Sequence, residues 1–135
     1  MIGLFDASAV IPLFTEEEAT RSAREAFRSS ERCIGLDLTL AEVANGFWRK
    51  KRLGFFTAAQ ASLAAREAHA LFQAILPTEP LMSAALDIAL RLDHPVYDCL
   101  YAVAAQREGA RLVTADRRFA DRLAGEPVEV LLLDA

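Results

Sequence analysis

Residues 94–119 read HPVYDCLYAVAAQREGARLVTADRRF and predict a helix, a tight turn and a short strand. Pro95 lies just ahead of the helix start, and Gly109 closes the helix C-terminus. Every residue from 99 to 105 is apolar, so little of this helix can face water. The strand at residues 111–114 follows so soon after the helix that we expect it to lie in a parallel sheet.

This stretch also carries two carboxylates at positions that matter in parallel sheets. Asp98 lies in the first turn of the predicted helix, and Asp116 comes directly after the predicted strand. Open α/β sheets bind their ligands at the carboxyl ends of their strands. We therefore expect at least Asp116 to lie at the functional edge of the sheet.

The rest of the chain predicts the same alternation of short strands and helices. Strands are expected at residues 2–5, 32–36, 76–78, 111–114 and 128–133, the last of them covered on both faces. Helices are expected at residues 7–14 with a break at Pro12, then at 16–30, 39–52, 57–74, 81–92 with Met82 inward, and 117–123. The three glutamates at residues 16–18 would suit the first turn of their helix. The pattern predicts a three-layer α/β/α domain with a mainly parallel, about five-stranded sheet.

Length and composition are those of an ordinary globular protein, and we expect one domain spanning residues 1–135. The net charge of −4 argues against a protein that coats nucleic acid by bulk charge. There is no basic leader before the first apolar residues and no apolar run near the ~20 residues of a membrane span, so we expect neither a signal peptide nor membrane association. Cys33 and Cys99 are expected to be buried, reduced thiols of a cytoplasmic protein.

Four carboxylates stand out, and each has a purely structural explanation. Asp6 and Asp116 end predicted strands and would cap the helices that follow them. Glu42 stands three residues after Thr39, which is the spacing of a capping box. Asp98 would complement the dipole of its own helix. Because capping is so common, each acid taken alone is more simply explained as structural.

Taken together, the same four acids favour a metal site. Strand ends and the starts of the following helices meet at one edge of a parallel sheet, where four carboxylates would repel one another. A hard divalent cation removes this conflict and prefers oxygen ligands. Mg²⁺ or Mn²⁺ fits this set of acids, whereas zinc would call for His or Cys nearby.

Other chemistries find less support in the sequence. His69 lies in a predicted helix and His94 in a loop, and neither belongs to a Ser-His-Asp arrangement. A phosphate-accepting receiver domain would need an acid pair after the first strand and a late lysine. A phosphatase of the haloacid dehalogenase type would need a second aspartate where Ser8 stands. A catalytically silent or phosphate-accepting α/β signalling or binding domain with an acidic cation pocket stays open as the alternative.

Four patches of sequence carry a resemblance to a known family. They read DASA at residues 6–9, LAEV at 40–43, YDCLY at 97–101 and LVTADRRF at 112–119. In this order and spacing they resemble PIN-domain ribonucleases, and most closely the VapC-type toxins of toxin–antitoxin pairs. The last two patches, joined by the glycine turn, are the more specific ones.

The resemblance implies a parallel sheet in the strand order 3-2-1-4-5 and a Mg²⁺- or Mn²⁺-dependent endoribonuclease. It implies that the catalytic metal ligands are Asp6, Glu42, Asp98 and Asp116, and it suggests Ser8 and Thr114 as supporting hydroxyls. It also implies an RNA substrate, a homodimer and inhibition by a cognate VapB-type antitoxin. Relatives often have Pro or Ser where residues 35–37 stand here, and we expect Asp37 to be a surface residue.

An acidic protein must still hold the phosphates of RNA. Arg117 and Arg118 flank Asp116, and this position favours contact with substrate phosphates. Arg49 opens the basic run at residues 49–52, near the end of a predicted helix. Basic residues also favour helix C-termini for structural reasons, so for this run both explanations stay open.

Overall fold

A five-stranded sheet forms the centre of the molecule. The computed structural model describes residues 1–134. The strands are β1 (Ile2–Phe5), β2 (Arg32–Leu36), β3 (Ala74–Leu76), β4 (Arg111–Thr114) and β5 (Val130–Leu132). They pair in parallel in the order β3-β2-β1-β4-β5. Both the predicted parallel α/β class and the strand order implied by the resemblance are confirmed.

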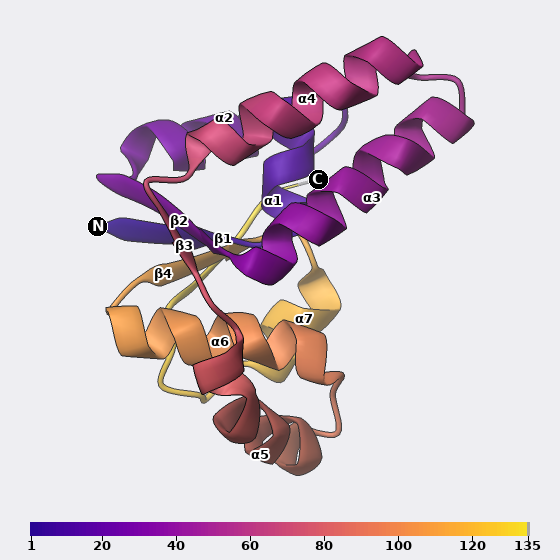
Figure 1. Ribbon diagram of the computed structural model, residues 1–135. Coiled ribbons are helices and arrows are strands. Elements are labelled where there is room, and N and C mark those ends of the chain that lie inside the picture. Colours follow the sequence, from indigo (N-terminus) through magenta and orange to yellow (C-terminus); the bar gives the residue numbers. More distant parts are fainter. Residues whose placement is uncertain (135) are drawn as a thin grey trace.

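Helices cover both faces of this sheet. They are α1 (Ala7–Val10), α2 (Thr20–Ser29), α3 (Asp37–Arg52), α4 (Ala58–Leu71), α5 (Met82–Leu92), α6 (Val96–Glu108) and α7 (Arg117–Arg122), with 3₁₀ turns η1 (Ile11–Leu13) and η2 (Glu79–Leu81). In Figure 1, α1 to α4 lie on one side of the strands and α5 to α7 on the other. Helices α3 and α4 run side by side and are joined at the far right of the view. The architecture is therefore three-layered.

Alternation along the strands gives each face its own core. Leu4 and Leu112 pack in the cluster that includes the apolar residues of α5 and α6. Their neighbours Phe5 and Val113 pack in the opposite cluster, with residues of α1, α3 and α4. Successive side chains of a strand point to opposite faces, so a sheet covered on both sides needs continuous apolar strands. This is why the strands show so little alternation between apolar and polar residues.

The stretch from residue 94 to residue 119 folds as predicted. Pro95 lies directly before α6, and all residues from 99 to 105 are buried. Gly109 ends the helix with φ at 61°, a left-handed conformation that glycine adopts without steric cost. The chain then enters β4 within two residues. Helix and strand together deliver Asp98 and Asp116 to the carboxyl edge of the sheet.

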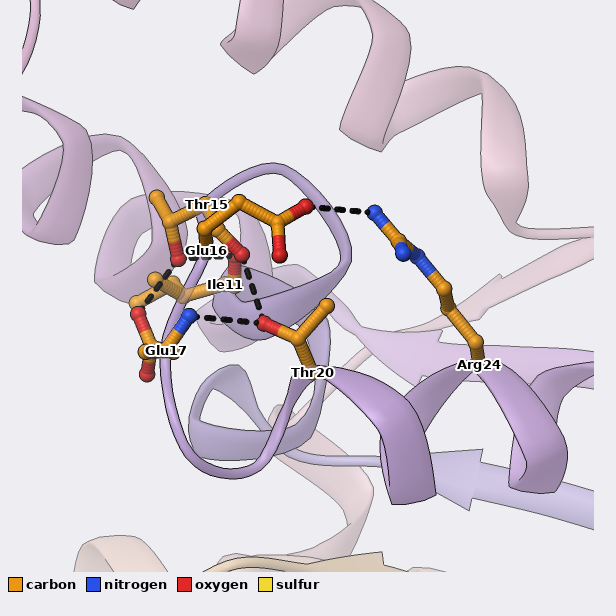
Figure 2. Close-up of polar contacts among 6 residues, drawn as sticks. All are labelled: Ile11, Thr15, Glu16, Glu17, Thr20 and Arg24. Carbon is orange, nitrogen blue, oxygen red and sulfur yellow. Dashed lines mark hydrogen bonds and ion pairs between the residues drawn. The ribbon is translucent and has the colours of Figure 1, made fainter.

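The run of three glutamates does not open a helix, contrary to the prediction. These acids lie in the turn before α2, which begins at Thr20. The Thr20 hydroxyl donates to the Thr15 carbonyl at 2.6 Å and accepts from the Glu17 backbone N–H at 3.0 Å (Figure 2). Glu16 pairs with Arg24 at 3.0 Å, as the dashed line in Figure 2 marks. The hydroxyl that satisfies the backbone of the turn therefore sets the helix start, and Glu16 and Glu17 pair with Arg24 and Lys50 instead.

Three smaller expectations about packing and boundaries are also wrong. Strand β3 covers residues 74–76 rather than 76–78, because α4 already ends at Leu71. Strand β5 lies at the sheet edge and is half-buried along its length, so it is not covered on both faces. Met82 is 45% exposed rather than inward. Within residues 1–134, no helix has the length and apolarity that crossing a membrane requires.

Candidate active site

A small acidic pocket lies where β1 and β4 end. Its volume is about 190 Å³. It is lined by Asp6, Ala7, Ser8, Glu42, Asp98, Tyr101 and Asp116. All four predicted acids therefore meet in one place, although they come from four separate parts of the chain. The topology explains this, because the carboxyl ends of parallel strands and the starts of the following helices share one edge.

Asp6 is the most buried of the four acids. It caps α1, since its Oδ1 accepts a hydrogen bond from the Ala9 backbone N–H at 3.1 Å. Burial raises the pKa of Asp6 from 3.8 to about 7, and the negative charge of Asp98 adds to this rise. The hydroxyls of Ser8 and Thr114 and the Ala9 N–H oppose it. An ionised Asp6 is thus costly here unless positive charge lies beside it.

The two predicted supporting hydroxyls link Asp6 to Asp116. Ser8 donates to Asp6 Oδ1 at 2.6 Å and accepts from the Ala115 backbone N–H at 2.8 Å. Its oxygen lies 3.2 Å from that of Thr114, which accepts from the Asp116 backbone N–H at 3.1 Å. This network ties the loop after β1 to the loop after β4. Asp6 and Asp116 are therefore held in fixed positions relative to each other at the edge of the sheet.

Glu42 is not part of a capping box. The structural explanation offered for it from the sequence, a box formed with Thr39, is therefore wrong. Helix α3 begins at Asp37, two residues earlier than predicted, and Thr39 accepts from the Leu36 backbone N–H at 2.9 Å. Glu42 instead accepts a hydrogen bond of 2.5 Å from the Tyr101 hydroxyl. Burial raises the pKa of Glu42, and the charge of Asp98 adds to that rise while the Tyr101 hydrogen bond opposes it.

Asp98 and Asp116 each have a clear hydrogen-bond partner. Asp98 Oδ2 lies 2.7 Å from Nε2 of His94, whose side chain is only 5% exposed. Asp116 caps α7 as predicted, with Oδ1 accepting from the Phe119 backbone N–H at 3.1 Å. Asp116 is exposed at the pocket, in contrast to the buried Asp6. Asp37 lies on the surface, as predicted, and does not line the pocket.

The oxygen ligands that this pocket offers are of the type that hard divalent cations prefer. Four carboxylates offer oxygen ligands, and burial raises the pKa of both Asp6 and Glu42. As placed, no three His, Cys, Asp or Glu side chains of residues 1–134 are grouped to hold one ion. Each carboxylate accepts a hydrogen bond from its own donor instead. Binding a cation therefore requires these carboxylates to move closer to one another within the pocket.

The basic residues expected to contact RNA occupy two separate places. Arg117 and Arg118 are exposed at the start of α7, directly after Asp116, and line a hollow of about 540 Å³ with Asp121 and Arg122. Arg49 is exposed near the end of α3 and does not line the acidic pocket. Arg117 directly follows a pocket acid in the chain, whereas Arg49 stands seven residues after Glu42.

Sequence reasoning missed two residues of the site, His94 and Tyr101. The sequence places His94 in a loop and gives it no role, yet its side chain contacts Asp98. Its distance of four residues from Asp98 is the one signal that pointed to a contact. Tyr101 is buried at the pocket and bonds to Glu42, 59 residues away in the chain. No local pattern reveals a contact over such a distance.

Comparison with known proteins shows the family to which this fold belongs. The sequence profile described as "PIN domain" matches residues 4–124, a span that contains all four acids. The chain belongs to the PIN-domain family. This PIN domain is 32% identical to Ribonuclease VapC3 of Pyrobaculum aerophilum over 119 residues, which cover 87% of this chain and 91% of the relative. It is 30% identical to Exonuclease VapC9 of the same organism over 131 residues, covering 96% and 92%.

Solved structures share the fold of this PIN domain. The crystal structure of PAE2754 from Pyrobaculum aerophilum matches with a TM-score of 0.73 and 28% identity, over 96% of this chain and 83% of that chain. Structures from toxin–antitoxin systems also match, at identities between 15% and 22%. At that identity the likeness shows the fold alone.

Proposed function

We propose that this PIN domain is a metal-dependent endoribonuclease that acts as the toxin of a type II toxin–antitoxin system in the cytoplasm. The observation that carries the proposal is the meeting of Asp6, Glu42, Asp98 and Asp116 in one pocket of about 190 Å³. The names of the two curated relatives, a ribonuclease and an exonuclease, support the hydrolysis of nucleic-acid phosphodiester bonds.

The four acids would hold Mg²⁺ or Mn²⁺, and Asp6 has the strongest need for such a cation. A bound divalent cation supplies charge neutralisation at phosphorus and an activated water for in-line attack. A bound cation would favour the ionised forms of Asp6 and Glu42, which burial disfavours. Ser8 and Thr114 keep the two loops at a fixed separation, so the acids face the same phosphodiester.

Arg117 and Arg118 would hold the RNA chain beside the acids. Both are exposed and directly follow Asp116, so a phosphate next to the reacting one lies within their reach. Arg49 on α3 is a further candidate for contact with the backbone. Because the chain carries a net charge of −4, such local basic groups must offset the general repulsion of RNA.

The decisive test is cleavage of RNA with and without metal. Purified protein should cut a mixed RNA substrate in Mn²⁺ or Mg²⁺ and not in EDTA. A circular RNA separates the two activities named for the relatives, because only an endonuclease can open it. Asp87→Asn, which removes an exposed acid of α5 outside both the acidic pocket and the hollow beside Arg117 and Arg118, is the matched control and should retain activity.

The alternative is a catalytically silent or phosphate-accepting binding domain whose acids act as caps. Asp6 and Asp116 do cap helices, which this alternative requires. It does not explain why Glu42 and Asp98, which cap nothing through their side chains, face the same pocket. Absence of both cleavage and Mn²⁺ binding would establish the alternative.

We also propose a homodimer that binds a VapB-type antitoxin. Large apolar side chains are exposed around the α3–α4 hairpin, among them Trp48 at 53%, Leu53 at 64% and Phe55 at 69%. Between these helices a mainly apolar groove of about 320 Å³ is lined by residues that include Phe47 and Trp48. Such a groove suits the apolar face of a peptide helix. Light scattering that shows a monomer at high concentration, with no inhibition by the protein of a neighbouring small reading frame, would contradict this.

A further inference from the structure

We infer that His94 is a positioning residue for the acidic pocket: its ring orients the carboxylate of Asp98 and links it to the cap at Asp116. The inference rests on the proposed function, since it concerns how the acids are prepared to bind a cation. His94 lies between α5 and α6, and these two helices and α7 lie on the same side of the sheet (Figure 1).

Backbone conformation and backbone hydrogen bonding restrain His94 independently of its side-chain contacts. Asp93, at the end of α5, adopts a left-handed conformation with φ at 51°. The His94 backbone N–H then donates to the Ala89 carbonyl at 3.1 Å, and Pro95 restricts the next step of the chain. The connection between α5 and α6 that carries His94 is therefore short and conformationally restricted. The His94 side chain is only 5% exposed.

The direction of the hydrogen bond follows from the chemistry of the two groups. His94 Nε2 lies 2.7 Å from Asp98 Oδ2. An ionised carboxylate only accepts, so Nε2 carries the proton and donates it, whether the imidazole is neutral or charged. A carboxylate has two oxygens, so this bond fixes one and leaves the other to bind a cation. Hydrogen-bonded ligands of this kind are the rule in metal sites.

The imidazole is itself held by a buried aromatic ring. It stacks on Phe119, with ring centroids 5.3 Å apart and an angle of 14° between the planes. Phe119 is only 1% exposed, and its backbone N–H donates to Asp116 Oδ1 at 3.1 Å. One residue thus supports His94 through its side chain and Asp116 through its backbone. The stack therefore connects the residues just before α6 to the first turn of α7.

A purely structural role for His94 makes a different prediction. If the imidazole only fills space, replacing it by another flat ring of similar size leaves the pocket unchanged. If it orients Asp98, loss of the donor weakens cation binding while the fold survives. The variants His94→Phe and His94→Gln separate these roles, because phenylalanine keeps the stack and glutamine keeps an N–H donor near the position of Nε2.

The experiment measures Mn²⁺ binding by calorimetry in the absence of RNA. His94→Phe should melt close to wild type in EDTA and bind Mn²⁺ roughly 10- to 100-fold more weakly, and His94→Gln should recover part of that loss. The control is His69→Gln, since His69 is the other histidine of the chain and is exposed on α4. A folded His94→Phe variant that binds Mn²⁺ as tightly as wild type overturns the inference and leaves the proposed nuclease intact. A wild type that binds no Mn²⁺ overturns both.

A second measurement needs no variant and so does not depend on folding. The chain has only two histidines, so the imidazole resonances in a ¹⁵N spectrum are simple to assign. Saturation with Mg²⁺ should shift the Nε2 resonance of His94 and leave that of His69 in place. A His94 resonance that stays unmoved at saturating Mg²⁺ overturns the inference, because the hydrogen-bond acceptor would then not sense the bound cation.

Discussion

Asp6 carries the clearest pH dependence of the molecule. Burial raises its pKa from 3.8 to about 7, so at intermediate pH the folded protein keeps a proton that the unfolded chain has lost. The stabilisation from this proton is complete below about pH 4 and disappears as pH rises through about 7, with a slope of at most ~1.4 kcal/mol per pH unit. Asp6→Asn keeps the acceptor for Ser8 and the Ala9 N–H but cannot ionise.

We therefore expect the metal-free wild type to lose stability relative to Asp6→Asn as pH rises from 4.5 to 7.5. Urea unfolding of both proteins in EDTA across this range provides the measurement. The difference between the two curves isolates Asp6 from the other titrating groups. Curves that run parallel would show that Asp6 ionises with an ordinary pKa and that its burial has no consequence for the site.

Asp98 is the acid whose loss should matter most for catalysis. It lines the pocket, and its charge adds to the rise in pKa that burial causes at Asp6 and Glu42. Asp98→Asn should keep the fold and abolish metal-dependent RNA hydrolysis, because a neutral amide is a poor ligand for a hard cation. Circular dichroism checks the fold, and cleavage of labelled RNA in Mn²⁺ checks the activity. A variant that cuts at the wild-type rate would remove Asp98 from the ligand set.

Among single residues, the sequence indicated the four acids and the hydroxyls of Ser8 and Thr114. It did not indicate Tyr101 and His94, which hydrogen-bond to Glu42 and Asp98. Ser8 and Thr114 were found because they stand next to the acids in the patches at residues 6–9 and 112–119. Tyr101 was hidden because its bond to Glu42 joins positions 59 residues apart, and a tyrosine within an apolar helix predicts only burial. Contacts of this kind depend on how α3 and α6 pack, which no local pattern encodes.

At the scale of elements, the turn between α6 and β4 is the feature on which the site depends. Gly109 has φ at 61°, and within residues 1–134 no heavy atom beyond Gly109 and its two chain neighbours lies within 4 Å of where a Cβ would stand. Gly109→Ala should therefore cost about 1 kcal/mol through backbone strain alone, without a clash. Gly109→Asn should cost less, because asparagine tolerates the left-handed region better. Urea unfolding of the three proteins gives the order, and an alanine variant as stable as wild type would contradict it.

Elements with strong local signals were predicted well, and those that depend on side-chain partners were not. Helix α6 was clear because its apolar run is bounded by Pro95 and Gly109. The start of α2 was misplaced because the Thr20 hydroxyl, not the acid run, satisfies the preceding turn. Strand β5 was expected to be covered on both faces, yet its apolar residues lie at a half-buried edge. An apolar run indicates a strand but does not say how many helices cover it.

At the scale of the whole molecule, the fold concentrates negative charge that no neighbouring basic residue offsets within the pocket. None of the pocket-lining residues within the described range is basic, although the chain contains 15 Lys and Arg. Several basic residues pair with glutamates outside the pocket, as Lys50 does with Glu17 at 3.2 Å. Stability of the complete protein should therefore depend on a divalent cation, and this dependence can be measured without knowing the RNA substrate.

Mn²⁺ at ~100 times its dissociation constant should stabilise wild type by ~2.7 kcal/mol, or roughly 10 °C in melting temperature for a chain of this size. Asp116→Asn keeps the acceptor that caps Phe119 but removes one charged ligand, so it should gain much less from Mn²⁺. In EDTA the two proteins should melt within a few degrees of each other, because Asp116 is exposed and solvent screens its charge. Asp121→Asn removes an exposed acid outside the pocket and should respond to Mn²⁺ like wild type. If Mn²⁺ leaves the wild-type melting temperature unchanged, the four acids do not hold a cation and the proposal of a metal-dependent nuclease fails.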